Sequence, residues 1–236
     1  MSLKRGFAIL CIAAMALGPL GCVDVPSTGP QLPDYRSNFR FINAASDASP
    51  GQLFIDGKSQ GSLTLSQATA YLDLPAGSRQ LVVAGNATRD TVTKAFVTDR
   101  RGSVLLFTKG AAAGAIRTVT ILNERFSYDT LGATVPADTA LVRLANGLSD
   151  GTASQAVDVK RVTGTDTLSV ATGVAFSAVT GYVKVPAGQH TLLVMAAGTT
   201  NVLASAAVSP ASKSRHLAVV FGTPAAVSSV GVFQEQ

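Results

Sequence analysis

Histidine is the side chain best suited to proton transfer near neutral pH, and this sequence has two, His190 and His216. Both fall in segments that we expect to be strands. The number of Ser, His and Asp residues would allow a Ser-His-Asp triad, but we expect no G-x-S-x-G spacing or similar nucleophile elbow to position a serine. The pair also lacks the H-x-H or H-E-x-x-H spacing of zinc sites. We therefore interpret both as exposed strand or turn histidines and predict no catalytic residue and no metal ligand.

Side-chain oxygens recur at two equivalent places, Asn43 with Asp47 and Asn146 with Asp150. Clustered oxygens in a loop could hold Ca²⁺, which takes six to eight oxygen ligands. Asn and Asp also cap loops by accepting hydrogen bonds from nearby backbone N–H groups in Asx-turns. Since each copy offers just two candidate ligands, we favour turn capping over a metal site.

Two tyrosines, Tyr71 and Tyr182, also occupy equivalent places, each opening an expected strand. They could form a platform for a ligand, yet a tyrosine there usually packs across the sheet, with its hydroxyl reaching backbone or water. The chain has no Trp, and aromatic residues make up 6% of it. This composition disfavours a typical carbohydrate-binding face.

The two cysteines, Cys11 and Cys22, belong to the N-terminal region. Lys4 and Arg5 precede an uncharged, mostly apolar run at 7–20, which has the length of a signal-peptide core and is short for a membrane span. The sequence LGPLGC at 17–22 resembles the lipobox of bacterial lipoproteins, with Pro where that family usually has Leu. The resemblance implies cleavage before Cys22 and acylation of it, as with palmitate. Secretion with cleavage elsewhere is the alternative.

Such processing would leave the folded part without a thiol, and hence without disulfides, metal-thiolate clusters or a cysteine nucleophile. We expect a signal peptide at 1–21 and a flexible tether at 22–38, rich in Pro, Ser, Gly and Asp. Val23, rather than Asp, follows the cysteine. By resemblance to lipoprotein sorting, this favours the outer membrane. We expect a lipid-anchored protein of the bacterial cell envelope that faces the periplasm or the exterior.

The amino-acid composition limits the classes of function that remain. Of the 236 residues, 47% are hydrophobic and 14% are charged, and the formal net charge is +5. Lys4 and Arg5 contribute two of these charges, and the other basic residues are scattered. We therefore expect no nucleic acid partner. The many small and β-branched residues favour strands over helices.

An internal repeat covers most of the chain. RFINAASD at 40–47 matches RLANGLSD at 143–150, and YLDLPAG at 71–77 matches YVKVPAG at 182–188. A closing strand at 104–110 lies opposite the segment 216–222. The order is kept while the offset grows, which indicates duplicated modules with different loops. We expect the first insertion in the second copy at 160–173.

Each copy is predicted to be a series of short strands. Apolar and polar residues alternate at 71–74 and at 182–185, as they do when side chains point to opposite faces of a sheet. Pro-Ala-Gly then ends the strand in a tight turn, and Asp56-Gly57 is a second turn signal. No segment has an amphipathic helical period over three turns. Strands at such regular spacing predict an all-β fold of sandwich type.

These paired motifs resemble the DUF4397 family of bacterial cell-surface and secreted proteins. The resemblance covers about 38–124 and 139–233, and it implies two tandem immunoglobulin-like β-sandwich modules outside the cytoplasm. We place the first module at 39–126, a linker at 127–138 and the second module at 139–236. The family's function is unknown, so the resemblance implies no catalytic residue and no cofactor.

We therefore expect a non-enzymatic lipoprotein whose modules bind an envelope protein or support envelope structure, with the membrane contacted through the lipid on Cys22. Edge strands and loops of a sandwich would supply the contact. A module that binds a glycan or another small ligand is the alternative. A hydrolase ranks last, because no carboxylate pair or other catalytic group stands out.

Overall fold

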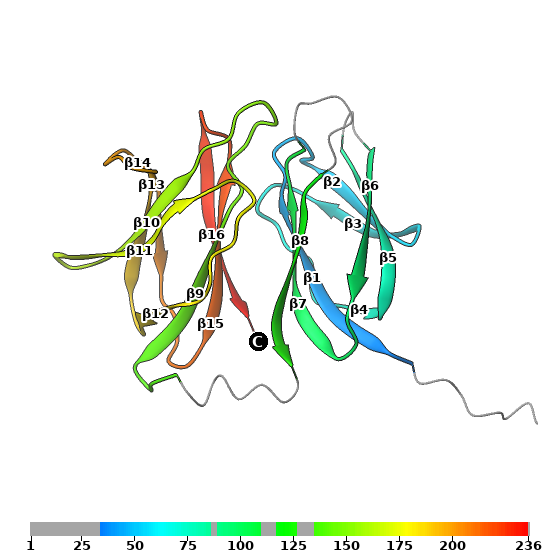
Figure 1. Cartoon of the computed structure of the whole chain (residues 1–236), viewed down its shortest axis with the longest axis horizontal. Coiled ribbons are helices and arrows are strands. Elements are labelled where there is room, and N and C mark those ends of the chain that lie inside the picture. Colours follow the sequence, from blue (N-terminus) through cyan, green and yellow to red (C-terminus); the bar gives the residue numbers. More distant parts are fainter. Residues whose placement is uncertain (1–33, 86–88, 110–116, 127–134, 236) are drawn as a thin grey trace, which may run out of the picture. The chain divides into compact units, whose positions relative to one another are not determined.

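The computed structural model describes residues 34–235, apart from 86–88, 110–116 and 127–134. The described residues form sixteen strands (Figure 1). None of these described residues is helical, so none of them belongs to a helix that could cross a membrane. The first eight strands are β1 (Arg36–Ala44), β2 (Gly51–Ile55), β3 (Lys58–Leu63), β4 (Leu72–Pro75), β5 (Gly77–Ala84), β6 (Arg89–Phe96), β7 (Arg100–Phe107) and β8 (Val119–Phe126). The second eight are β9 (Thr139–Asn146), β10 (Val157–Thr163), β11 (Asp166–Val174), β12 (Val183–Pro186), β13 (His190–Ala196), β14 (Val202–Val208), β15 (Arg215–Gly222) and β16 (Val227–Glu235).

The strands form four sheets of four. In the first module the sheets have the orders β4-β1-β7-β8 and β3-β2-β5-β6, and in the second β12-β9-β15-β16 and β11-β10-β13-β14. Each strand of one module thus has a counterpart eight strands later. Pairing is antiparallel except between β1 and β7 and between β9 and β15, which run parallel. The prediction of an all-β sandwich fold is confirmed.

Each module has its own apolar core between its two sheets. In the first module three phenylalanines, Phe39, Phe41 and Phe96, form the aromatic part of that core. The core of the second module is built mainly from Val, Leu and Ala. The repeat therefore conserves the strand order while it changes the side chains that fill the interior.

We call the β1- and β9-containing sheets the middle sheets, and their central strands β1, β7, β9 and β15 are buried on both faces over most of their length. Their outward faces meet in a third apolar core that takes Ile42 and Leu105 from the first module and Leu217 and Val219 from the second. Strands covered on both sides have near-continuous apolar sequences rather than alternating ones. This explains why β7 contains the apolar run VLLF and β15 the apolar run LAVVF.

The first module begins earlier than the sequence indicated. We expected the tether to reach residue 38, yet β1 begins at Arg36, which pairs with Pro75 at the end of β4. The signal peptide, Cys11, Cys22 and the tether up to residue 33 lie outside the described residues. The chain leaves β8 at Phe126 and enters β9 at Thr139.

The predicted turns occur where the motifs place them. Asp56 and Gly57 have φ of 48° and 79° and connect β2 to β3, as Asp-Gly does in tight hairpins. Gly77 and Gly188 end the Pro-Ala-Gly motifs with φ of 101° and 103°. The expected insertion lengthens the β10–β11 hairpin, which extends beyond the rest of its sheet in Figure 1.

Candidate functional site

The side chains that recur in the repeat form a buried polar cluster in the first module. Arg40 on β1 lies with its Nη2 3.3 Å from Oε1 of Glu124 on β8. Tyr71, just before β4, donates its hydroxyl to Oε2 of Glu124 at 2.5 Å, and Ser103 on β7 donates to Oε1. The Glu124 side chain is fully buried. Side chains from two strands and one loop thus converge on a single carboxylate of β8.

The second module repeats this arrangement with Arg143, Tyr182 and Glu235. Arg143 forms an ion pair with Oε1 of Glu235, and Tyr182 donates its hydroxyl to Oε2 at 2.7 Å. We call the two sets the Arg-Tyr-Glu clusters. A leucine, Leu217, takes the register position of Ser103, since they pair with Arg143 and Arg40 respectively.

Two further arginines lie near the tyrosine rings. The guanidinium carbon of Arg101 is 3.8 Å from the centre of the Tyr71 ring, and that of Arg215 is 5.9 Å from the Tyr182 ring. A guanidinium within about 6 Å of a ring centre is attracted by the ring quadrupole. Each cluster therefore combines two cations, one carboxylate and one aromatic ring.

The electrostatics of the clusters keep the tyrosines protonated. Burial, aided by the hydrogen bond to Glu124, raises the pKa of Tyr71 to about 12. The pKa of Tyr182 is raised in the same way, with burial as the main cause. Burial also raises the pKa of Glu235 although Arg143 opposes the shift. At neutral pH these tyrosines act as hydrogen-bond donors and are poor bases.

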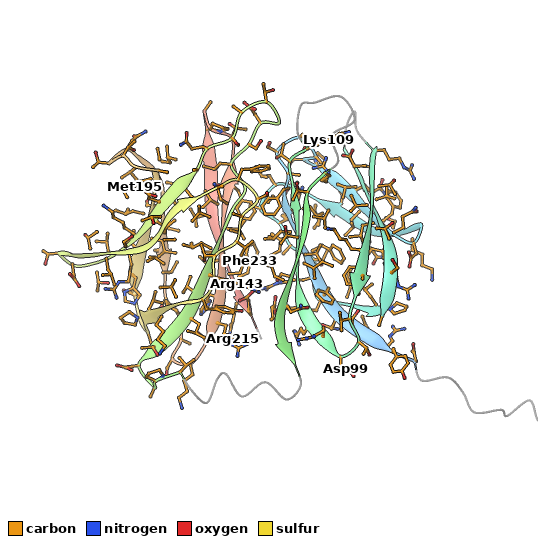
Figure 2. The ribbon with its side chains drawn as sticks, viewed as in Figure 1. Asp99, Lys109, Arg143, Met195, Arg215 and Phe233 are labelled. Atoms are coloured by element: carbon orange, nitrogen blue, oxygen red, sulfur yellow. The ribbon has the colours of Figure 1, made fainter. Side chains whose placement is uncertain are left out.

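The two clusters meet where the middle sheets face each other. Nη1 of Arg215 donates to the backbone carbonyl of Glu124 at 2.7 Å, and Arg40 lies 5.5 Å from the ring of Phe233. Figure 2 labels Arg143 on β9, Arg215 on β15 and Phe233 on β16, which are all strands of the middle sheet of the second module. This placement gives the clusters a structural role, because their polar atoms are directed at one another inside the protein.

Our interpretation of Tyr71 and Tyr182 as packed residues is therefore correct, but their hydroxyl partners are carboxylates rather than backbone or water. Sequence reasoning missed Glu124 and Glu235. The signal was present, since the same 53 residues separate each tyrosine from its glutamate. A comparison of the repeats that extended into β8 and β16 would have found the pair.

The Asn/Asp pairs are mostly turn caps. Nδ2 of Asn43 donates to the carbonyls of Ala48 and Leu63, and its Oδ1 accepts from the N–H of Ala45. Asn146 makes the equivalent three bonds in the second module. Asp150 accepts from two backbone N–H groups, and these bonds hold the pKa of its carboxyl below the ordinary value.

Asp47 differs, because it binds a buried arginine. Arg117 is fully buried and contacts both oxygens of Asp47 at 2.9 Å, while its Nη2 contacts Oδ2 of Asp90 at 2.9 Å. Lys109 completes the network 3.0 Å from Oδ1 of Asp90 (labelled in Figure 2). Two cations neutralise the two carboxylates, so neither is available to Ca²⁺. No three His, Cys, Asp or Glu side chains cluster within the described residues.

The histidines are less exposed than we expected. His190 is 8% exposed, with Nε2 2.7 Å from the carbonyl of Pro186 and Nδ1 2.8 Å from the Thr163 hydroxyl. Since a carbonyl can only accept, Nε2 carries a proton and donates it to Pro186, while Nδ1 and the Thr163 hydroxyl form the second hydrogen bond. His216 is half-buried beside Ser214, and burial lowers its pKa. His190 therefore has a structural role.

The expectation that no serine has nucleophile-elbow spacing is wrong at the level of sequence letters. Gly147, Ser149 and Gly151 match G-x-S-x-G. Ser149 is nevertheless buried, its Oγ accepts from the N–H of Gly151, and the next element is the strand β10 rather than a helix. An elbow needs a strand-to-helix turn with an exposed hydroxyl, so the match has no catalytic meaning.

Comparisons with known proteins identify one family. A family model described as "Domain of unknown function (DUF4397)" matches residues 37–150, from β1 through β9. No curated protein matches the chain. Among solved structures, one described as α-glucan binding by a streptococcal virulence factor is 14% identical with a TM-score of 0.26, covering 84% of this chain and 97% of that one. A CBM26 module from Eubacterium rectale, solved with maltoheptaose, is 11% identical with a TM-score of 0.25, covering 85% and 97%.

Proposed function

Residues 37–150 of this chain belong to the DUF4397 family of domains of unknown function, and on that premise we propose that the protein is a non-enzymatic unit of the bacterial cell envelope. In this proposal the two modules present their outer sheets, β3-β2-β5-β6 and β11-β10-β13-β14, to a partner protein. A lipid on Cys22 holds the unit at the membrane.

The proposal rests mainly on the burial of the polar residues that occur in both modules. The Arg-Tyr-Glu clusters recur in both modules, and each is closed inside the protein with its carboxylate fully buried. A substrate could not reach groups that are hydrogen-bonded to one another and covered by the facing sheet. The polar residues that occur in both modules therefore stabilise the fold, and we assign binding to the outer sheets.

The outer sheets have features suited to a protein partner. Their exposed positions include short polar side chains, such as Thr91 and Thr93 on β6 and Ser205 on β14, beside charged ones such as Lys58 on β3. Edge strands are commonly protected by charges or proline. The edge strand β14 has neither over Val202–Val208, and Val202 is 51% exposed. Such an edge can pair with an extended segment of another protein.

The anchor is tested with the Cys22→Ser variant beside the wild type, both expressed in a bacterial host. Intact mass and membrane fractionation should show a wild-type species that begins at Cys22, carries acyl mass and sediments with membranes. The variant should lose the acyl mass and leave the membrane fraction. A wild-type protein that is released without added mass would instead point to plain secretion, with Pro19 impairing lipobox processing.

The partner is tested by photo-crosslinking in cells. A photoreactive amino acid is placed at Thr93 or at Ser205, with Lys184 on the middle-sheet strand β12 as an exposed control position. We expect a discrete protein adduct from an outer-sheet position and none from Lys184. Saturable glycan binding without a protein adduct would favour the alternative, a glycan-binding module, and would overturn this proposal.

A further inference from the structure

The second module contains a pocket of ≈ 250 Å³ between its two sheets. It opens where β14 and β16, the edge strands of the two sheets, approach each other. Its lining is Val142, Leu192, Ala207, Val208, Ser209, Pro210, His216, Val232 and Gln234. No lining residue carries a fixed charge, and the polar side chains are those of Ser209, His216 and Gln234.

The strand register relates this pocket to the core of the first module. Phe39 on β1 pairs with Gly102 on β7, and the same register in the second module pairs Val142 on β9 with His216 on β15. Phe96 occupies the end of β6 opposite Gly77. Its counterpart is Pro210, whose carbonyl accepts from the N–H of Gly188.

In the first module aromatic rings fill the equivalent space. The rings of Phe39 and Phe96 are 5.0 Å apart in an edge-to-face arrangement, and both side chains are buried. The Phe39 ring lies directly over Gly102, since a Cβ there would be 2.4 Å from Cε1 of Phe39. The same Cβ would be 2.3 Å from the backbone carbonyl oxygen of Leu122, so both the ring and this carbonyl require glycine at this position.

The second module has neither of these rings and no glycine at the equivalent positions. Val142 and Pro210 are too small to replace the two phenylalanines, and His216 takes the register position of Gly102. The space that remains is apolar on most sides and has hydrogen-bonding groups from His216 and Gln234. A cavity of about 150 Å³ is already large enough for benzene.

We propose that this pocket binds a small uncharged molecule with one aromatic ring and a hydroxyl group, of the phenol class, whose ring takes the place of Phe39 and Phe96. The apolar walls favour a ring, and an uncharged pocket disfavours an ion because burial of an unpaired charge is costly. The ring would lie between Val142 and Pro210, and the hydroxyl would bind Gln234 or the ring nitrogen of His216 that does not contact Ser214. This ligand is separate from the partner protein of the proposed function.

The test uses p-cresol as the probe and NMR of the valine methyl groups of the full chain. We expect saturable shifts at Val208 and Val232 in the wild type. The double variant Val142→Phe/His216→Gly rebuilds the Phe39/Gly102 pair and fills the pocket, so p-cresol affinity should fall by at least about tenfold. Lys184→Phe adds the same side chain at an exposed position on β12, the edge of the sheet opposite β16, and should leave affinity unchanged.

A second variant covers the case in which the double variant does not fold. Val232 is 37% exposed at the rim, so Val232→Phe narrows the pocket without entering the core, and it should also weaken p-cresol binding. The proposal is overturned if p-cresol gives no saturable shifts in the wild type. It is equally overturned if a folded Val142→Phe/His216→Gly protein, or Val232→Phe, binds p-cresol as tightly as the wild type does.

Discussion

A buried carboxylate depends on the cations and donors around it, and Glu235 is the clearest case among the described residues. Its side chain is fully buried against Arg143 and the hydroxyl of Tyr182. Such a pair adds little compared with an apolar replacement of both partners, but removal of one charge leaves the other buried and uncompensated. The stability of the second module therefore depends on keeping both partners.

The variant Glu235→Gln tests this dependence. Glutamine keeps the shape and can still accept from Tyr182, but it leaves the Arg143 guanidinium without a countercharge. We expect the free energy of unfolding to fall by about 3 kcal/mol, measured by urea denaturation at pH 7. Asp73→Asn makes the same chemical change in the exposed Arg36–Asp73 pair and should change little. Equal effects of the two variants would contradict a special role for the buried cluster.

Asp158 provides a prediction about pH. Its carboxylate accepts from the N–H of Gly173 at 2.7 Å and of Gly198 at 2.8 Å, and these bonds lower its pKa from the ordinary 3.8. A lowered pKa in the folded state means that the ionised form stabilises the fold above the unfolded pKa. That contribution is lost as the pH falls through 3.8 and then through the lower folded value.

Asp158→Asn should therefore unfold at lower urea concentration than the wild type at pH 7. The difference between the two proteins should shrink as the pH falls below 3.8, because the wild-type carboxyl then becomes neutral as well. Urea midpoints measured between pH 2 and pH 7 give the comparison. A difference that stays constant over this range would show that the charge of Asp158 has no role.

At the scale of elements, the sequence predicted turns and outer strands better than boundaries. Asp56-Gly57 and the two Pro-Ala-Gly motifs are local signals, since the backbone conformation they need depends on the residues at those positions. The start of β1 was missed because Arg36 to Asn38 are polar and their order comes from backbone pairing with β4. The pattern of apolar and polar side chains does not reveal such backbone pairing.

Gly188→Ala tests the turn that ends the Pro-Ala-Gly motif. Gly188 has φ of 103° and open space where a Cβ would stand, so the substitution adds backbone strain without a steric clash. We expect a loss of about 1 to 2 kcal/mol in the free energy of unfolding. Gly181 also has open space but no positive φ, so Gly181→Ala is the matched control and should leave stability unchanged or slightly higher. A Gly188→Ala protein as stable as the control would refute the strain argument.

At the scale of the whole molecule, the contact between the middle sheets was not predictable from the repeat. The apolar runs of β7 and β15 indicated buried strands, but they could not say that the covering surface is the other module. Likewise, the hydrogen bond from Arg215 to Glu124 joins residues 91 apart. The same limit applies to the candidate site. The internal repeat identified Arg40 and Tyr71, but the glutamate that binds both of them was recognised only from the three-dimensional structure.

The third apolar core predicts that the two modules unfold together. Phe107 is fully buried in that core and packs edge-to-face on Phe176 of the second module, 5.8 Å between ring centres. Phe107→Ala should cost about 3 to 5 kcal/mol, and because the loss falls on the contact between modules, calorimetry should resolve two transitions in place of one. Phe96→Ala removes an equally buried ring from inside the first module, so it should lower the single transition without splitting it. Two transitions in the wild type, or splitting by Phe96→Ala alone, would show that the middle sheets do not couple the modules.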